Sequence, residues 1–454
     1  MIKCPNCGGE LKYNASNNLV RCEHCGSEFQ ANQQIAPTKK SKETTELKGK
    51  VYSCSQCGAN LMAFDETAVT FCSYCGSQAM IESKMTIQTN PGYIIPFSKT
   101  KEECIKTFKN KVNRSLFIPN YMKSDLVVDK FRGIYIPYCI YKLGYKGIDK
   151  EKGTKYSHRS GDYQYYDDYE LQFDVDAKYE GFSYDLSSKF YDRYSEAIPF
   201  NEEEKIPFSP NYMLGYYADA KDVSGDVYLD TAKNEAHIDY SKVITSTREA
   251  IKYNCKGAHV NFEQEEQEIA MFPLYFLAIR SKNEKKVNYA IVNGQTGELV
   301  TELPVSYTKY VIGSLILSVI IFLFANKFLV LTPHEVCFAA IVFALVGLGI
   351  CFIQAYELSN REKHNDDLGL KSVKEVEKAE KAFSILGIAI AFLATLIPVL
   401  VLAMNPVDDI FYYEAAIASL GLVLFNFYNI IKKHNDLVST KLPQLEKRGG
   451  DESE

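Results

Sequence analysis

Four Cys-x-x-Cys pairs near the start of the chain constrain its fold more than any other feature. Two pairs separated by fourteen residues form one module, and the same spacing recurs fifty residues later. The eight cysteines are Cys4, Cys7, Cys22, Cys25, Cys54, Cys57, Cys72 and Cys75. Two such pairs supply the four thiolates of a tetrahedral zinc site, and the glycine after each first pair permits the tight turn that follows. We predict two structural Zn²⁺ ions per chain.

The modules are too small to bury a core of their own, so bound metal must supply much of their stability. We therefore predict two small β zinc ribbons, over residues 1–30 and 51–90, joined by a polar linker over 31–50. Dithiol redox chemistry needs a single pair at the start of a helix, and catalytic zinc needs an open coordination position. Neither pattern is present. His24 lies inside a pair and is interpreted as a solvated residue.

Nucleic-acid binding is an alternative function for zinc ribbons. Residues 1–50 contain eight Lys/Arg against five Asp/Glu, residues 51–90 are nearly uncharged, and the whole chain has a net charge of -6. A nucleic-acid surface would show a dense basic stripe or stacked aromatic residues. The sequence therefore disfavours nucleic acid as a partner.

Residues 91–305 predict an α+β body with an antiparallel sheet. Thr100 and Glu103 form a capping box at the start of a helix that should end before Pro119. Alternating apolar residues predict a strand over 133–142, in which Pro137 marks an edge or a bulge. Further strands are expected at 169–175, 268–280, 287–292 and 298–301, and a second helix at 219–245.

The body shows no sign of catalysis. No nucleophile elbow, phosphate loop, zinc-protease motif or kinase motif is present, so we expect the protein not to be an enzyme. Residues 151–250 carry 21 acidic against 11 basic side chains, and 163–169 is rich in tyrosine and aspartate. This segment could bind a basic partner or could be a solvated loop.

Residues 306–436 predict a C-terminal region of four transmembrane helices. The apolar runs are long enough to cross about 30 Å of hydrocarbon, and they lie near 310–331, 336–356, 382–407 and 411–431. Runs this long and uncharged disfavour buried soluble helices. A transport function is also disfavoured, because no span carries a central ionisable residue.

Loop charge predicts the orientation of these spans. The connection after the second span and the tail over 437–454 are rich in Lys and Arg, which places both on the cytoplasmic side. The chain begins Met1-Ile2-Lys3-Cys4, so we expect no signal peptide and a reducing environment. We predict a multi-pass protein of the cell membrane with both termini in the cytoplasm. The sequence Lys-His-Asn-Asp follows the second span at 363–366 and the fourth span at 433–436.

Several further motifs occur in a characteristic order. They are Ile-Ile-Pro-Phe at 94–97, Gly-Ile-Tyr-Ile-Pro-Tyr at 133–138, Asn-Gly-Gln-Thr-Gly at 293–297, Pro304, and Leu-Pro-Gln-Leu-x-x-Arg-Gly-Gly at 442–450. With the ribbons and the paired spans, this order resembles the bacterial TFIIB-type zinc-ribbon membrane proteins, the YdjG-like group. The resemblance implies association with phage-shock-type and SPFH-type envelope-stress proteins. We therefore expect a membrane-anchored adaptor or scaffold that binds cytoplasmic proteins and the lipid bilayer; the sequence leaves homo-oligomerisation open.

Overall fold

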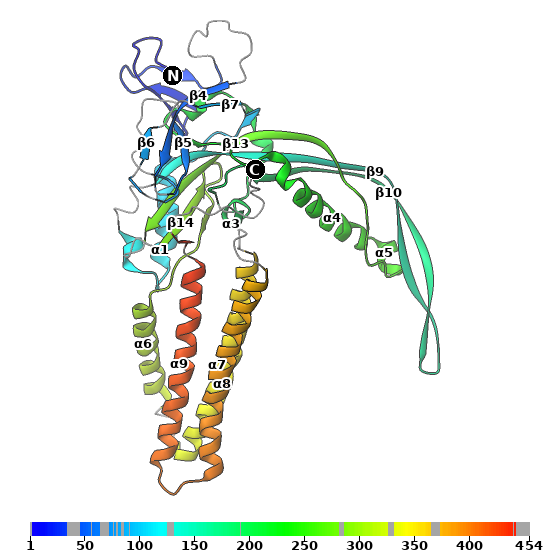
Figure 1. Ribbon diagram of the computed structural model, residues 1–454, viewed down its shortest axis with the longest axis vertical. Coiled ribbons are helices and arrows are strands. Elements are labelled where there is room, and N and C mark those ends of the chain that lie inside the picture. The colour runs from blue at the N-terminus through cyan, green and yellow to red at the C-terminus, as the bar shows by residue number, and fades with distance from the viewer. Residues whose placement is uncertain are drawn as a thin grey trace.

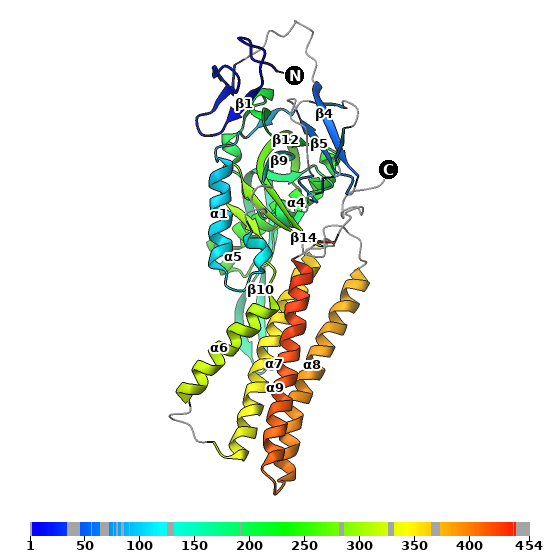
Figure 2. The ribbon, with the colours of Figure 1, turned by 90° about the vertical axis from the view of Figure 1, so that its left-hand side faces the viewer.

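The molecule is elongated, with a sheet-rich body at one end and a bundle of helices at the other (Figures 1 and 2). The computed structural model describes residues 2–33, 46–55, 57–63, 72–75, 77–78, 80–82, 86–89, 91–124, 131–190, 192–280, 286–325, 331–364, 373–438 and 440–441. Both cysteine modules lie at the end of the molecule opposite the helix bundle. A long hairpin extends sideways from the body and bends toward the level of the bundle.

The first cysteine module is a separate three-stranded antiparallel sheet. It consists of β1 (Leu11–Asn14), β2 (Leu19–Cys22) and β3 (Glu28–Gln30), in the order β1-β2-β3. Leu11, Tyr13 and Val20 are buried and belong to the core that the module shares with the body. The prediction that this module is a small β fold is therefore confirmed.

The second cysteine module belongs to the main sheet of the body. It contributes β4 (Glu46–Cys54), β5 (Asn60–Ala63), β6 (Met80–Glu82) and β7 (Thr86–Thr89). Strand β5 pairs with β12 (Tyr217–Asp219), which in turn pairs with the body strand β9 (Arg132–Ser160). The linker expected over 31–50 is shorter than predicted, since β4 begins at Glu46. Residues 34–45 lie outside the described part of the chain.

The body has α+β architecture, as predicted. Its sheet is mainly antiparallel, with parallel pairings of β12 with β9 and of β13 (Glu263–Arg280) with β8 (Tyr93–Ile94). Its remaining strands are β8 (Tyr93–Ile94), β9 (Arg132–Ser160), β10 (Tyr163–Asp185), β11 (Ile206–Pro207), β13 (Glu263–Arg280), β14 (Lys286–Asn293), β15 (Leu299–Thr301) and β16 (Thr440–Lys441).

Strand β9 is central in the sheet, and apolar cores cover both of its faces. Ile134, Ile136, Tyr138 and Ile140 all belong to one core cluster, which confirms their predicted alternation. The expectation that Pro137 marks an edge strand or bulge is wrong. Proline has no backbone N–H to donate to a neighbouring strand. Pro137 is accommodated in this central strand because it lies where the strand paired with β9 changes from β12 to β10.

The helices of the body are shorter than those that follow it. They are α1 (Lys101–Arg114), α3 (Asp192–Ser195), α4 (Leu229–Thr245) and α5 (Arg248–Lys252), with 3₁₀ turns η1 (Asn120–Lys123), η2 (Glu202–Glu204), η3 (Pro210–Met213) and η4 (Gly225–Tyr228). The capping box of Thr100 and Glu103 is present at α1. The helix expected over 219–245 begins ten residues later, because Asp219 ends strand β12 and the η4 turn precedes the helix.

Four apolar helices follow the body: α6 (Tyr307–Ala325), α7 (Pro333–His364), α8 (Val373–Met404) and α9 (Ile410–Leu437). Within the described residues, three stretches are long and apolar enough to cross a membrane: Pro333–Leu358, Ile385–Met404 and Ile410–Leu437. Helix α6 contributes a shorter apolar stretch, Tyr307–Ile321. Residues 326–330, the end of the first predicted span, lie outside the described part.

The end of α9 returns to the body. The Asn435 side chain accepts a hydrogen bond from the Val305 amide at 2.8 Å and donates one to the Val305 carbonyl at 2.9 Å. The Asn288 side chain donates to the Val438 carbonyl at 2.8 Å. Beyond it, β16 pairs with β14. The second Lys-His-Asn-Asp segment therefore joins the helix bundle to the body; residues 365–366 of the first lie outside the described part.

Candidate metal centres and an adjoining cleft

The first module brings four predicted ligands together around one point. The Sγ atoms of Cys4 and Cys25 are 3.6 Å apart, and those of Cys7 and Cys22 are 3.5 Å apart. All four sulfurs lie within 4.8 Å of one another. A tetrahedral zinc site with Zn–S bonds of about 2.3 Å places its sulfurs about 3.8 Å apart. The four thiols therefore fit one tetrahedral metal ion.

The second module forms an equivalent cluster in a drier setting. The Sγ atoms of Cys54 and Cys75, and those of Cys57 and Cys72, are each 3.6 Å apart. All four cysteines are buried, whereas the first cluster has two exposed members. Four thiolates complete the coordination shell of zinc, so both clusters have the chemistry of structural sites.

Local backbone conformation positions these cysteines. Gly8, Gly26 and Gly58 each follow a cysteine pair and have φ between 72° and 74°. Only glycine adopts this conformation at little cost. The Gly9 amide donates a hydrogen bond to the Cys7 sulfur at 3.4 Å. Such turns direct backbone amides toward sulfur and stabilise the thiolates that metal binding requires.

The exposed Cys25 of the first cluster has a lowered pKa. The Ser27 hydroxyl lies 3.1 Å from its sulfur, and this contact together with the Ser27 amide lowers the pKa of Cys25 to about 6. A thiol with that pKa is largely ionised at neutral pH, and metal binding needs the thiolate. His24 is exposed and is not part of the cluster.

Each module is attached to the body through a tyrosine. In the first, the Tyr13 hydroxyl lies 3.2 Å from the Phe97 carbonyl, to which it can donate its hydrogen. In the second, the Tyr74 hydroxyl donates to the buried Asp219 carboxyl group. Sequence reasoning missed both tyrosines, because each acts on a residue far along the chain.

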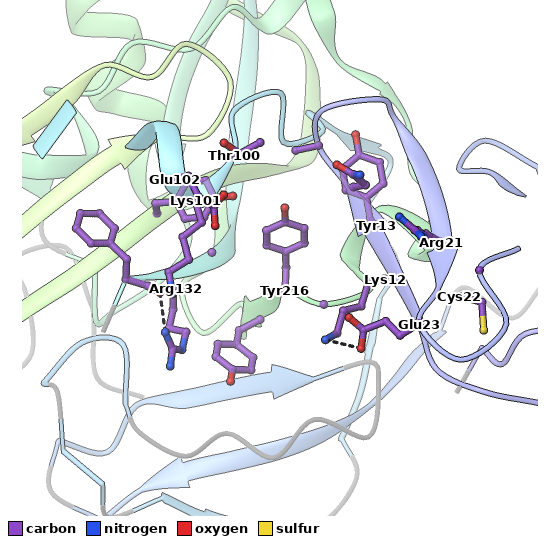
Figure 3. A pocket seen from close by; sticks show the side chains of 18 residues that line it. Lys12, Tyr13, Arg21, Cys22, Glu23, Thr100, Lys101, Glu102, Arg132 and Tyr216 are labelled. Atoms are coloured by element: carbon purple, nitrogen blue, oxygen red, sulfur yellow. Dashed lines mark hydrogen bonds and ion pairs between the residues drawn. The ribbon is translucent and has the colours of Figure 1, made fainter. Parts of the chain in front are cut away.

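A cleft of about 750 Å³ separates the first module from the body (Figure 3). Its walls come from β1 and β2, from the start of α1, and from the segments around Arg132 and Tyr216. The Tyr216 side chain points into the cleft in Figure 3, and its ring stacks on Phe97 with centroids 4.1 Å apart. This cleft was not predicted, because its walls come from separate segments without a local motif.

The charges that line the cleft are mostly positive. The charged side chains are Lys12, Arg21, Lys101, Arg132, Glu23 and Glu102. Lys12 is paired with Glu23, at 2.9 Å. The lining therefore carries a surplus of two positive charges in a chain whose net charge is -6. A positively charged, tyrosine-lined cleft suits an acidic ligand.

Two four-cysteine clusters on a sheet-rich body above apolar helices are the features of a membrane-anchored protein with zinc-ribbon-like sites. The chain is similar to the uncharacterized protein YdjG of Bacillus subtilis (strain 168), with 25% identity over 313 residues that cover 57% of this chain and 91% of that protein. No family model matches the chain, and no solved structure matches it.

Proposed function

We propose that this protein is a membrane-anchored, non-catalytic adaptor whose zinc ribbons and body bind a cytoplasmic protein. The observation that carries the proposal is the cleft between the first module and the body. Figure 1 shows the first module at the end of the molecule opposite the helix bundle. A metal-stabilised module forms one wall of this cleft. The proposed role of zinc is structural: it stabilises the fold of the module and therefore the wall that the module contributes to the cleft.

The path of the chain supports a cytoplasmic body with four membrane crossings. Because β16 pairs with β14, the end of α9 and the body lie on the same side of the bilayer. Three crossings by α7, α8 and α9 would leave them on opposite sides. We therefore infer that the apolar helix α6 provides a further crossing. Basic residues near the body-facing ends of α7, α8 and α9 favour the cytoplasm for this side, because Lys and Arg are enriched in cytoplasmic loops.

The chemistry of the cleft points to an acidic segment of the partner protein. Carboxylates would meet the surplus positive charge, and the tyrosine rings offer apolar surface beside it. An envelope-stress protein of the SPFH or phage-shock type is the partner class that the family resemblance suggests.

Pull-down of the tagged full-length protein in detergent tests this proposal. The variant Arg21→Glu/Lys101→Glu reverses two charges in the cleft, while Lys106→Glu reverses an exposed charge elsewhere on α1. We expect one cytoplasmic protein to be retained by wild type and by Lys106→Glu but lost from the cleft variant. If every captured protein binds all three equally, the proposal fails. Nuclease-sensitive retention of nucleic acid by the wild type alone would favour the nucleic-acid alternative.

A further inference from the structure

The β9–β10 hairpin extends far beyond the sheet from which it arises. The two strands pair from Asp185↔Tyr138 near the body to Tyr163↔Ser160 at the turn. Strand β13 accompanies β9 only as far as Gly144. From there on, the arm is a two-stranded ribbon (Figures 1 and 2). Isolated two-stranded ribbons are marginally stable in water, so a supporting surface is required.

The first part of the arm is supported by helices α4 and α5. The Tyr240 hydroxyl donates to Asp149 at 2.8 Å, and the Thr154 amide donates to the Tyr253 carbonyl at 2.5 Å. The Tyr169 ring also packs on Tyr253, with centroids 4.6 Å apart. These contacts fix the direction of the arm as far as its last third.

The tip of the arm, residues 156–168, makes no such contacts with the rest of the described chain. The Tyr156 and Tyr166 rings meet at 5.9 Å, and His158 stacks on Tyr165 at 4.7 Å. These pairs stabilise the hairpin itself. Four large tyrosines nevertheless remain exposed, and Tyr163 at the turn is 74% exposed. The tip therefore presents aromatic surface to whatever lies beside it.

The two views place this tip at the level of the helix bundle. The arm bends away from the body, and its tip reaches the height of the helices (Figures 1 and 2). On the side of the body, charged residues bound the apolar runs of α7 and α8, among them Arg361 and Lys363 after the first and Lys378 and Lys381 before the second. The near surface of the bilayer therefore crosses the bundle below its upper end, on the side toward which the tip points.

We propose that the tip of the arm lies in the headgroup layer of the bilayer, with its tyrosines as interfacial anchors. Tyrosine is enriched at this depth because its ring is apolar and its hydroxyl group reaches water. The charged residues of the tip are Arg159, Asp162, Asp167 and Asp168. This composition gives no attraction to anionic lipid, so zwitterionic lipid is sufficient for the contact.

Such a contact would add a second membrane attachment, remote from the bundle and rigidly joined to the body. It would fix the tilt of the body and the direction in which the cleft faces. The contact involves the arm and the bundle alone, whichever partner the cleft binds.

The absence of tryptophan from the chain makes the proposal directly testable. Tyr163→Trp places one tryptophan at the tip, and Ile81→Trp places one at a site that is 61% exposed in the second cysteine module, far from the helices. Each full-length variant is reconstituted in phosphatidylcholine nanodiscs with or without brominated acyl chains. Bromine quenches tryptophan only at close range, so the comparison reports contact with lipid.

We expect brominated lipid to lower the fluorescence of Tyr163→Trp by about twofold, because the side chain lies at the interface. Ile81→Trp should show no quenching. Equal, unquenched fluorescence of both variants would overturn the proposal. Acrylamide quenching would then show where the tip lies instead. Strong quenching of Tyr163→Trp would place the tip in water, and weak quenching would place it against protein. Unchanged circular dichroism confirms that both variants are folded.

Discussion

At the scale of single residues, Tyr74 and Asp219 connect the second metal cluster to the body. Tyr74 lies between Cys72 and Cys75, and its hydroxyl donates to Asp219, which also accepts a hydrogen bond from Ser187. Burial and the nearby Asp222 raise the pKa of Asp219 to about 7. The position of the cluster on the sheet therefore depends on a carboxyl group that titrates near neutral pH.

Asp219 predicts a measurable pH dependence of stability. Its pKa in the unfolded chain is about 3.9, so its stabilising contribution is complete below about pH 4 and is lost as pH rises to about 7. The variant Asp219→Asn keeps an acceptor at this position but does not titrate. We expect the thermal midpoint of the wild type, relative to that of Asp219→Asn, to fall between pH 6 and pH 8. Parallel pH profiles would contradict this account.

Sequence reasoning found the cysteines but not the residues that connect them to the body. The cysteines are recognisable because metal chemistry fixes their spacing. Tyr74 and Asp219 are separated by 145 positions, and nothing local relates them. The cleft residue Tyr216 was missed for the same reason.

At the scale of elements, local signals predicted helix α1 well. The capping box is formed by two reciprocal hydrogen bonds, from the Thr100 amide to Glu103 at 2.8 Å and from the Glu103 amide to Thr100 at 3.3 Å. The arm was predicted poorly: strands were expected only at 133–142 and 169–175. Its distal residues are exposed on both faces, so hydropathy shows no alternation there.

Loss of the cap should weaken α1 and the cleft wall that it forms. Thr100→Ala removes the side-chain acceptor for the Glu103 amide, and such substitutions cost about 1 kcal/mol. We expect a lower thermal midpoint in detergent, while Lys106→Ala on the exposed face of the same helix has little effect. A midpoint unchanged by Thr100→Ala would show that the cap does not stabilise the body.

The joint between body and bundle depends on Asn435. Asn435→Ala removes both hydrogen bonds to Val305 and leaves the Val305 amide and carbonyl without these partners, a change that costs about 1–3 kcal/mol. Limited proteolysis should cut the 303–306 segment faster in this variant than in Lys432→Ala, the control at a neighbouring position of the same helix. Equal cleavage rates would mean that other contacts hold the joint.

At the scale of the whole molecule, two modules of equal spacing have different structural roles. The first is a separate sheet that closes a cleft, and the second is part of the main sheet. The sequence predicted two ribbons of the same kind, because the cysteine spacing is identical in both modules. The difference comes from pairing with β12, a strand far along the chain, which no local pattern reveals.

The proposed arrangement predicts that both ends of the chain lie on the cytoplasmic side. Green fluorescent protein fused to either end should fluoresce, because it matures in the cytoplasm. Alkaline phosphatase inserted after Asp408, between α8 and α9, should be active because that connection lies on the opposite side. Loss of fluorescence from one end alone would exclude an even number of crossings.

Metal analysis of the purified full-length protein tests the central claim most directly. We predict two zinc ions per chain, falling to one in Cys7→Ser and to one in Cys57→Ser, since each substitution opens a four-thiolate shell. Cys255→Ser is the matched control, because this buried thiol donates to the Gly257 carbonyl at 3.2 Å and belongs to neither cluster. It should retain two zinc ions. A wild-type content near zero, or a content unchanged by both cluster variants, would contradict the account.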